Sequence, residues 1–290
     1  MRQRGSLLAL MRNSSGPDRT PAGDERGQSS TLTSLPEITS AERAVADLLP
    51  IGADPEQARR VLARVPLWFH TFALNAEHGL YTPGVARDHR YRVPLLPASF
   101  AGRRVLDVGT FDGFYAYLAE HRGATRVVAV DNEQYIAWVK ARWGVVLTGG
   151  EGFRAIGALL GSRVEYVRGD ALTLRDTGER FDVIFCFGIL HRVENPLGLM
   201  RALGERLAPG GRLLVETYGI AHDGRVDERA IEVQQRGGIY PGDEFVYWGF
   251  GAGGLTALAG LAGFAEATIE ATPTIDGHPR VLGALVRPGA

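Results

Sequence analysis

The chain has 290 residues, 45% of them hydrophobic and 22% charged, and 32 Lys and Arg against 33 Asp and Glu leave a formal net charge of -1. This balance is typical of a globular protein and gives no broad basic field for nucleic acid, which makes a nucleic-acid partner unexpected. Its single cysteine, Cys186, provides neither a disulfide framework nor the ligand set of a structural zinc site, and we expect no metal. No apolar run approaches the roughly 20 residues of a membrane span, so we expect a cytoplasmic protein without a membrane partner.

The N-terminal third predicts a tail followed by a cap. Residues 1–36 are rich in Ser, Thr, Gly and Arg without apolar periodicity, which predicts a flexible tail. Residues 41–49 have helical spacing, and Asp54 followed by Pro and Glu has the N-cap pattern of a second helix. An aromatic stretch follows around Trp68. We therefore predict a small helical and aromatic N-terminal cap over residues 37–100.

Residues 101–290 alternate short apolar runs with helical stretches, which predicts an α/β fold with a doubly wound, mostly parallel sheet of seven strands. The expected strands are Val105–Val108, Val127–Val130, Val164–Val167, Val183–Phe187 and Leu213–Glu216, and the expected helices are Phe114–His121, Gln134–Trp143, Phe153–Leu160 and Leu197–Leu207. A turn is expected at Pro209-Gly210-Gly211. After a loop-rich stretch, a helix at Leu255–Leu261 precedes two edge strands, Ala267–Ala271 and Val281–Val286, which a turn at Asp276-Gly277 would join as an antiparallel hairpin.

The stretch RVLDVGTFDGF, residues 104–114, carries the main functional signal. It has the pattern of a strand that ends in a glycine-containing loop before a helix, and ligands of open α/β sheets bind at such strand ends. Gly109 and Gly113 let the backbone approach a ligand closely. The spacing differs from the G-x-G-x-x-G of a nicotinamide or flavin site. Asp107 would repel a pyrophosphate and favour a cationic amino group.

Two further acids end the next two strands. Asp131 stands 24 residues beyond Asp107 and could accept hydrogen bonds from both hydroxyls of a ribose. Asp170 could accept a hydrogen bond from an adenine amino group. Together the three acids predict a pocket for a nucleoside that carries a positive charge and no phosphate.

Residues 104–218 resemble a class I S-adenosylmethionine-dependent methyltransferase, because five stretches occur in the order of that class. They are VLDVGTFDGF, VVAVD, RGDA, FDVIFCFGILH and LAPGGRLLVET. The resemblance implies the Rossmann-like methyltransferase fold and S-adenosylmethionine as the cofactor. The residues that it implies in cofactor binding are Asp107, Gly109, Thr110, Phe111, Gly113, Asp131, Asn132, Gly169, Asp170, Ala171 and Phe187.

Within this class the chain is similar to the branch of tRNA wobble-uridine carboxymethyl- and methyltransferases and related antibiotic-pathway enzymes. The likeness rests on WFH at 68–70, TPG at 82–84 and GILHRVENP at 188–196. That branch has Leu-Tyr-His where this chain has Leu190-His191-Arg192, and its Tyr is implicated in holding a carboxylated cofactor. Ordinary S-adenosylmethionine is therefore expected here. The common G-x-G of the first motif is replaced by Gly109-Thr110-Phe111.

The acceptor side is expected to use histidines and aromatic residues. His191 follows the fourth strand and could take a proton from a substrate hydroxyl or amine, or it could only pack or bond to the backbone. The resemblance implies that residues 219–252 include the loop over the acceptor. We expect substrate contacts from His70, Tyr240, Tyr247 and Trp248; the alternative is cap packing for His70 and a purely structural aromatic cluster for the others.

The expected function is methyl transfer to a hydroxyl, amine or activated carbon of a small molecule in secondary metabolism, such as antibiotic biosynthesis. One alternative is a tRNA wobble-uridine methyltransferase with a basic face. Its candidate residues are Arg87, Arg90, Arg92, Arg103 and Arg104. A second alternative is a non-catalytic S-adenosylmethionine-binding regulatory module. The aromatic cap could also serve as a homodimer surface.

Overall fold

The computed structural model describes residues 37–86, 89–172, 178–222, 225–235, 243–275 and 277–289. The tail predicted for residues 1–36 lies outside the described residues. The described residues belong to one compact unit. Among them, no helix has both the length and the apolar character that a bilayer span requires.

Both helices predicted before the sheet are present, and each begins at a side-chain cap. The Thr39 hydroxyl accepts a hydrogen bond from the Glu42 N–H, and Glu42 reaches back to the Thr39 N–H, which forms a capping box. Asp54 accepts hydrogen bonds from two backbone N–H groups of the second helix. The elements of this segment are α1 (Ser40–Ala46), α2 (Pro55–Arg64), β1 (Ala73–Asn75), β2 (Leu80–Tyr81), α3 (His89–Arg92) and the 3-10 turn η1 (Val93–Leu95).

Replacing Asp54 with Ala is expected to destabilise the protein by about 1 kcal/mol, the usual value of a lost N-cap. The Asp54 carboxylate oxygen accepts from Glu56 N at 3.0 Å and from Gln57 N at 3.1 Å. Urea unfolding measures the change. Asp54→Ser keeps a capping oxygen and is the matched control, so an equal loss in both variants would contradict the capping role.

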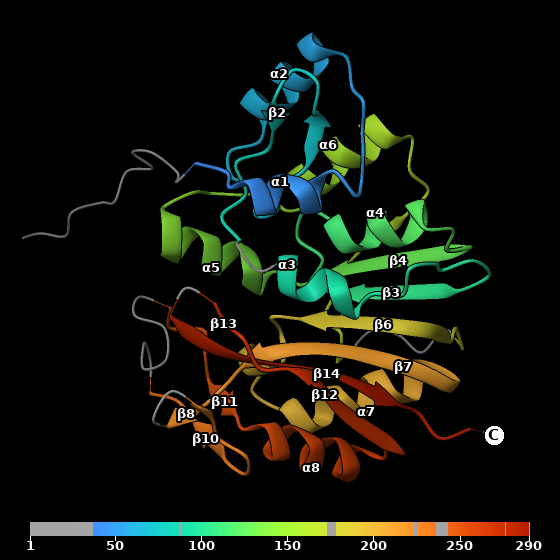
Figure 1. The fold of residues 1–290 in the computed structure, drawn as a ribbon, viewed down its shortest axis with the longest axis vertical. Helices are drawn as coiled ribbons and strands as arrows, with labels where there is room; N and C mark the ends of the chain where they lie inside the picture. Colours follow the sequence, from blue (N-terminus) through green and yellow to red (C-terminus); the bar gives the residue numbers. More distant parts are fainter. Residues whose placement is uncertain are drawn as a thin grey trace, which may run out of the picture. The chain divides into compact units, whose positions relative to one another are not determined.

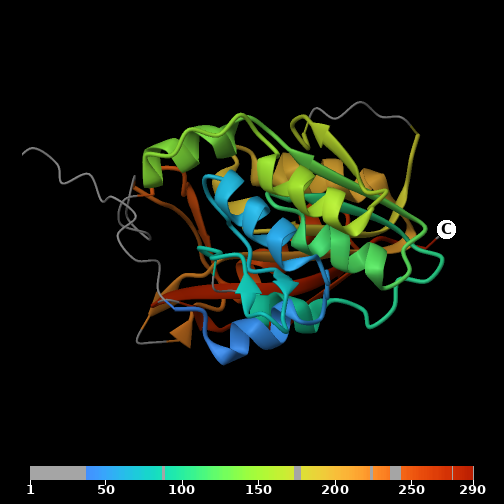
Figure 2. The same cartoon turned by 90° about the horizontal axis from the view of Figure 1, so that it is seen from above.

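A mostly parallel sheet forms the centre of the fold, as predicted, in the order β12-β14-β7-β6-β3-β4-β5, with β13 paired to β14 (Figures 1 and 2). The strands β3 to β7 are parallel to one another, whereas β14 pairs antiparallel with both β7 and β12. The strands are β3 (Arg104–Val108), β4 (Arg126–Asp131), β5 (Glu165–Arg168), β6 (Phe181–Phe187), β7 (Leu207–Tyr218), β12 (Glu266–Ala271), β13 (Thr274–Ile275) and β14 (His278–Val286). The chain order reverses between β3 and β6, which is where such sheets bind ligands.

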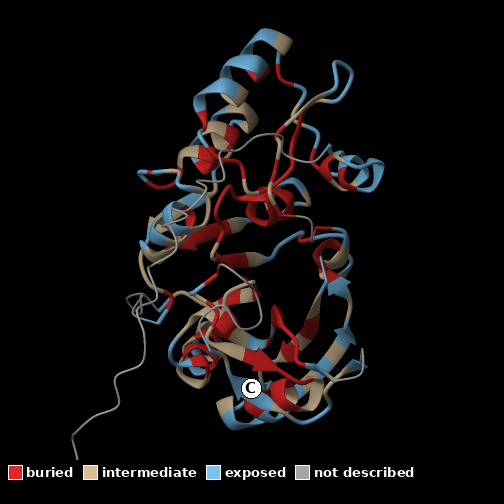
Figure 3. Ribbon diagram, turned by 90° about the vertical axis from the view of Figure 1, so that its left-hand side faces the viewer, coloured by how far each residue is buried: buried red, intermediate tan, exposed pale blue. Residues whose placement is uncertain are grey.

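Helices cover both faces of this sheet, and successive side chains of a strand pack on opposite faces. On β3, Val105 packs with α4 (Phe114–His121) and the N-terminal elements, whereas Leu106 packs with α7 (Pro196–Arg206) and α8 (Ala252–Ala262). The other two helices are α5 (Gln134–Trp143) and α6 (Glu151–Leu160). Figure 3 shows the buried residues along the central strands. Burial on both faces explains why these strands are apolar throughout.

Two details differ from the sequence prediction. The turn expected at residues 209–211 lies inside β7, where the register against β6 shifts between Phe181 and Val183, so the chain bulges without leaving the sheet. The stretch expected to be loop-rich contains two small antiparallel pairs. They are formed by β8 (Ala221–His222) with β9 (Arg225–Val226), and by β10 (Ile231–Val233) with β11 (Trp248–Phe250). Strands this short, with an exposed β10, leave no hydrophobic alternation to detect.

Candidate active site

The loop between β3 and α4 has a backbone that glycine normally provides. Gly109 has a φ of 76°, and a side chain there would collide with Ile189. Phe111 has a φ of 53° and is the one non-glycine residue with positive φ in the described part of the chain. That conformation costs an L-residue about 1–2 kcal/mol. The loop therefore keeps the shape of the common glycine motif although Phe111 replaces a glycine.

Two contacts hold Phe111 in this conformation. Its backbone N–H donates to both carboxylate oxygens of Asp131, at 3.2 and 3.1 Å. Its ring stacks on Phe69, with the ring centroids 4.6 Å apart. The loop is thus fixed both to the end of β4 and to the segment that precedes the sheet.

Asp107 and Asp131 are buried at the carboxyl ends of β3 and β4. The Thr110 hydroxyl donates to Asp107 at 2.7 Å, and burial raises the pKa of Asp107 to about 6 although this hydrogen bond and Arg92 oppose the shift. Burial also raises the pKa of Asp131 well above its ordinary value. Asp131 also accepts a hydrogen bond from the Tyr166 hydroxyl at 3.3 Å. A carboxylate can accept about four hydrogen bonds, so Asp131 can still bind a ligand.

The third predicted acid connects to this pair through Asn132. The Asn132 side-chain amide donates to Asp170 at 3.4 Å, and the Gly169 N–H donates to the Asp131 carbonyl at 2.8 Å. Asp170 also accepts a hydrogen bond from the Leu172 N–H at 2.8 Å. The ends of β4 and β5 are therefore tied to each other beside the pocket.

A pocket opens at these strand ends and brings together part of the predicted site. Of the predicted residues, those that line it are His70, Asp107, Gly109, Phe111, Asp131, Asn132, Phe187 and His191. Those that do not line it are Thr110, Gly113, Gly169, Asp170, Ala171, Tyr247 and Trp248. Tyr240 lies outside the described residues.

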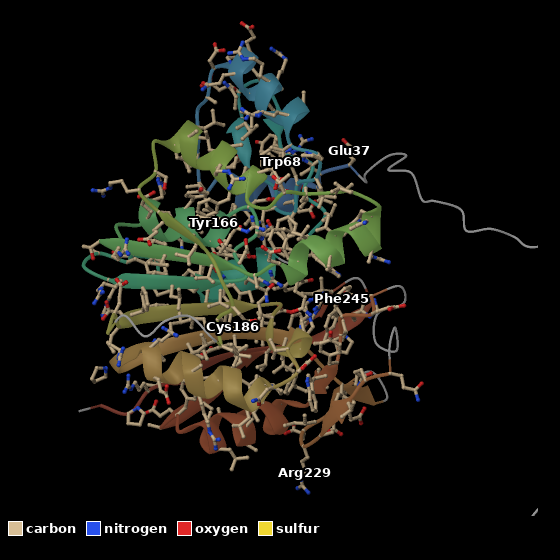
Figure 4. All side chains as sticks on the ribbon, turned by 180° about the vertical axis from the view of Figure 1, so that it is seen from behind. Glu37, Trp68, Tyr166, Cys186, Arg229 and Phe245 are labelled. Carbon is tan, nitrogen blue, oxygen red and sulfur yellow. The ribbon has the colours of Figure 1, made fainter. Side chains whose placement is uncertain are left out.

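The segment before β11 meets the pocket through other residues than those expected. Asp243 and Phe245 line the pocket, and Figure 4 labels Phe245. The Tyr247 N–H donates to the His191 carbonyl, and the Trp248 indole N–H donates to the Val193 carbonyl at 2.8 Å. Tyr247 and Trp248 therefore fasten this segment to the turn after β6. The sequence alone could not show that Phe245 faces the pocket while Tyr247 and Trp248 contact the turn after β6.

A buried ion cluster contributes to the wall of the pocket, and sequence reasoning did not identify it. Arg92 Nη2 lies 2.6 Å from Glu216 Oε2, and Arg280 Nη1 lies 3.3 Å from Glu216 Oε1. Both arginines line the pocket. Glu216 could have indicated this cluster from the sequence, because an acid inside an apolar strand favours a cationic partner. Arg92, which the sequence suggested for an exposed basic face, is only 4% exposed, so that expectation was wrong.

Comparison with known proteins agrees with this geometry. A family model described as a methyltransferase domain matches residues 81–252, which is more than half of the chain. The chain belongs to the methyltransferase domain family. It is a class I member with S-adenosylmethionine as the cofactor, near the branch of the tRNA U34 carboxymethyltransferases.

Individual relatives are more distant. A tRNA U34 carboxymethyltransferase from Cellvibrio japonicus is 26% identical over 215 residues, which cover 68% of this chain and 60% of that protein. A ribosomal RNA large subunit methyltransferase K/L from Shewanella sp. is 32% identical over 156 residues, which cover 49% of this chain and 20% of that protein. The chain thus spans between a fifth and three fifths of these relatives' length. The N-terminal domain of EvdMO1, solved with SAH and D-fucose, shares the fold with a TM-score of 0.54 at 20% identity, over 80% of this chain and 96% of that one.

In this methyltransferase, His191 has its tautomer fixed by the backbone. The Tyr218 N–H can only donate, so His191 Nδ1 accepts it, at 3.3 Å, and Nδ1 also lies 3.2 Å from the Thr217 hydroxyl. Burial, with Arg192 next, holds the pKa of His191 well below its usual value. The neutral ring therefore carries its proton on Nε2, which has no hydrogen-bond partner among the described residues. This arrangement favours a hydrogen-bond donor over the proton acceptor expected from the sequence.

His70 is the second buried histidine of the pocket wall. Burial, and then His89 and Arg92, hold its pKa well below the usual value, so the ring is neutral. Nδ1 is buried without a hydrogen-bond partner among the described residues. The ring packs 4.8 Å from that of His89 and 5.0 Å from that of Phe69, measured between centroids. A neutral imidazole at this position can accept a hydrogen bond, whereas its lowered pKa opposes full protonation.

Replacing Asp112 with Ala is expected to cost about 1–3 kcal/mol for each backbone N–H left without an acceptor. Its Oδ2 accepts from Phe69 N at 2.6 Å and from His70 N at 2.9 Å, so Asp112 fastens the segment that carries both rings to the glycine loop. Urea unfolding measures the loss.

Asp112→Asn is the matched control, because its amide oxygen can accept both N–H groups. Burial raises the pKa of Asp112 to about 7, so a neutral amide suits the site. Equal destabilisation by Ala and Asn would contradict the fastening role.

Proposed function

We propose that this methyltransferase methylates a small molecule bound at the end of the pocket formed by β6, β7 and β14. The observation that carries the proposal is the burial of this end. His191, Tyr218 and Arg280 line it and are 1%, 2% and 9% exposed, respectively. Walls of this kind suit an acceptor that is enclosed on most sides.

Of the arginines suggested for an RNA-binding face, Arg92 and Arg104 support the same choice. RNA binding depends on cations that reach phosphates. Arg92 is buried and Arg104 is paired with Glu179. Arg90 is exposed, and the Arg103 side chain is 60% exposed with its Nη1 3.8 Å from Asp182 Oδ1. Arg87 lies outside the described residues. A wobble-uridine methyltransferase remains the second candidate, because the similar protein from Cellvibrio japonicus is a tRNA U34 carboxymethyltransferase.

The pocket residues fit the cofactor, which supplies a methyl group already activated on a sulfonium when it is bound. Asp107 would hold its cationic amino group, and Asp131 would accept the ribose hydroxyls. Phe69 and Phe111 form an aromatic wall that excludes water from the reacting groups. This chain then has to align the acceptor with the methyl group and, for a hydroxyl or ammonium acceptor, remove a proton.

We propose that His70 accepts a hydrogen bond from the hydroxyl or amine of the acceptor and that His191 donates a hydrogen bond. His70 lies on the segment before the sheet, and we propose that residues 37–100 act as a cap that places it over the acceptor. The Asp112 contacts to Phe69 and His70 support this role, because they link the cap to the cofactor loop.

The test incubates the protein with S-adenosylmethionine and, in parallel, a panel of phenols, amines and sugars or total tRNA, and measures S-adenosylhomocysteine formation. We expect turnover with members of the small-molecule panel and none with tRNA. His70→Gln should lower kcat while the affinity for S-adenosylhomocysteine stays within threefold, since His70 serves the acceptor. Methylation of tRNA would favour the second candidate, and tight cofactor binding without any turnover would favour a regulatory module.

A further inference from the structure

Asp243 joins two walls of the pocket that come from opposite sides of the chain reversal in the sheet. Its Oδ2 accepts hydrogen bonds from the Trp138 indole N–H at 3.0 Å and from Arg192 Nη1 at 2.8 Å. Trp138 belongs to α5, which follows β4, and Arg192 belongs to the 3-10 turn η2 (Leu190–Arg192), which follows β6. All three residues line the pocket. Asp243 therefore bridges the crevice in which sheets of this kind bind their ligands.

Protein groups engage both oxygens of this carboxylate. Besides the two hydrogen bonds to Oδ2, Asp243 Oδ1 accepts from the Phe245 N–H at 3.0 Å. Asp243 is only 2% exposed, and the guanidinium carbon of Arg192 lies 4.6 Å from the centre of the Trp138 ring. Asp243, Trp138 and Arg192 thus contact one another in every combination, and we call these three residues the clasp. The carboxylate of the clasp holds protein groups together, in contrast to Asp107 and Asp131, which are proposed to bind the ligand.

The clasp completes a ring of contacts around the pocket. On one side, the Trp138 ring packs against those of Phe69 and Phe111, with centroids 5.8 and 6.5 Å apart. On the other side, Ile189, directly before η2, lies so close to Gly109 that a side chain on Gly109 would collide with it. All four of these residues also line the pocket. The ring therefore begins and ends at the loop between β3 and α4, and the clasp is the polar link in it.

The clasp lies on the solvent side of the pocket. Trp138 and Arg192 are half-buried, whereas Asp107 and His191, which line the same pocket at the strand ends, are 2% and 1% exposed. A ligand that reaches the strand ends therefore passes the rim to which the clasp belongs.

We infer that Asp243 is a positioning residue that closes the rim of the pocket, and that the cofactor and its product exchange only when the clasp opens. This inference rests on the cofactor pocket proposed above and adds how that pocket is closed. Because the clasp consists of protein groups, weakening it raises the population of the open state and speeds entry and release alike. A residue that held the ligand directly would instead act mainly on the release rate and so on the affinity.

The test measures both rate constants with radiolabelled S-adenosylhomocysteine. Rapid mixing and filtration give the association rate, and dilution into excess unlabelled ligand gives the release rate. In Asp243→Asn the amide oxygen can still accept from Trp138, but the charge that holds Arg192 is lost. One hydrogen bond to a charged group corresponds to roughly tenfold in an equilibrium constant. We expect both rates to rise by up to about tenfold and the dissociation constant to stay within threefold.

A second variant opens the clasp from its other side. Trp138→Phe keeps an aromatic ring and removes the N–H that Asp243 accepts, so both rates should again rise together. This variant decides the matter if Asp243→Asn does not fold. Glu165→Gln is the matched control, because it makes the same change of carboxylate to amide in an exposed pair with Arg126, at the start of β5 and outside the pocket. It should leave both rates unchanged.

The inference is overturned if neither variant raises the release rate. It is also overturned if release becomes faster while association stays the same or slows, because Asp243 would then hold the ligand itself or only support the fold. Failure of the unmodified protein to bind S-adenosylhomocysteine would be a failure of the proposed function itself.

Discussion

Replacing Asp107 with Asn is expected to weaken S-adenosylhomocysteine binding roughly ten- to hundredfold, the value of one hydrogen bond to a charged group. Asp107 is 2% exposed, lines the pocket and, within the described residues, accepts a side-chain hydrogen bond from the Thr110 hydroxyl. Asn keeps the volume and removes the charge that would hold an ammonium group. Calorimetry measures the change. Asp47→Asn is the control, because Asp47 is an exposed acid that does not line the pocket. This substitution should leave the affinity for S-adenosylhomocysteine unchanged.

The same carboxylate predicts how cofactor binding depends on pH. Because burial raises the pKa of Asp107 to about 6, this group gains its charge as the pH rises from 5 to 7. The amino group of the ligand stays cationic up to a pH of about 8. The affinity for S-adenosylhomocysteine should therefore increase with pH, by up to about tenfold per unit below the pKa.

Asp131 also titrates with a raised pKa, so the Asp107→Asn variant is needed to separate the two acids. Its pH profile should be flatter than that of the unmodified protein. Identical profiles would contradict the assignment of the ammonium site to Asp107.

Replacing Glu216 with Gln is expected to cause the largest loss of stability, about 3–5 kcal/mol, because it breaks a buried ion pair from one side. The Glu216 side chain is 0% exposed and that of Arg92 is 5% exposed, with their charged atoms 2.6 Å apart. Arg280 loses the same carboxylate. In a domain of this size, the midpoint of thermal unfolding should fall by roughly 6–20 °C.

The matched control makes the same substitution in an exposed ion pair. Glu56 and Arg60 are also 2.6 Å apart, but their side chains are 79% and 64% exposed. Glu56→Gln should change the unfolding midpoint by no more than about 2 °C, because exposed pairs contribute little. Similar effects at Glu56 and Glu216 would show that burial does not determine the contribution of Glu216.

The parts of the structure that follow from local pattern were predictable. The central parallel strands β3, β4 and β6 are buried on both faces and largely apolar. The alternation of strands and helices and the acids at strand ends could therefore be recognised without coordinates. Asp107 and Asp131 are predictable for this reason, because each lies at the carboxyl end of a buried strand.

The parts that depend on distant contacts were not predictable. Arg92 and Glu216 are separated by 124 positions, and nothing near either residue identifies its partner. The tautomer of His191 depends on the backbone of Tyr218, which β7 brings beside it. Phe111 resembled a departure from the glycine motif, yet Asp131 and Phe69 hold its backbone in the conformation of glycine.

The central claim is that the strand-end acids form a pocket for an adenosyl ligand. The most direct measurement is calorimetric titration of the unmodified protein and of Asp131→Ala with S-adenosylmethionine, S-adenosylhomocysteine and NADH. We predict binding of the two adenosyl ligands but not of NADH, and an affinity at least about tenfold lower in the variant, since the ribose loses a charged acceptor. Binding of NADH, or equal affinity of both proteins for S-adenosylhomocysteine, would contradict the claim.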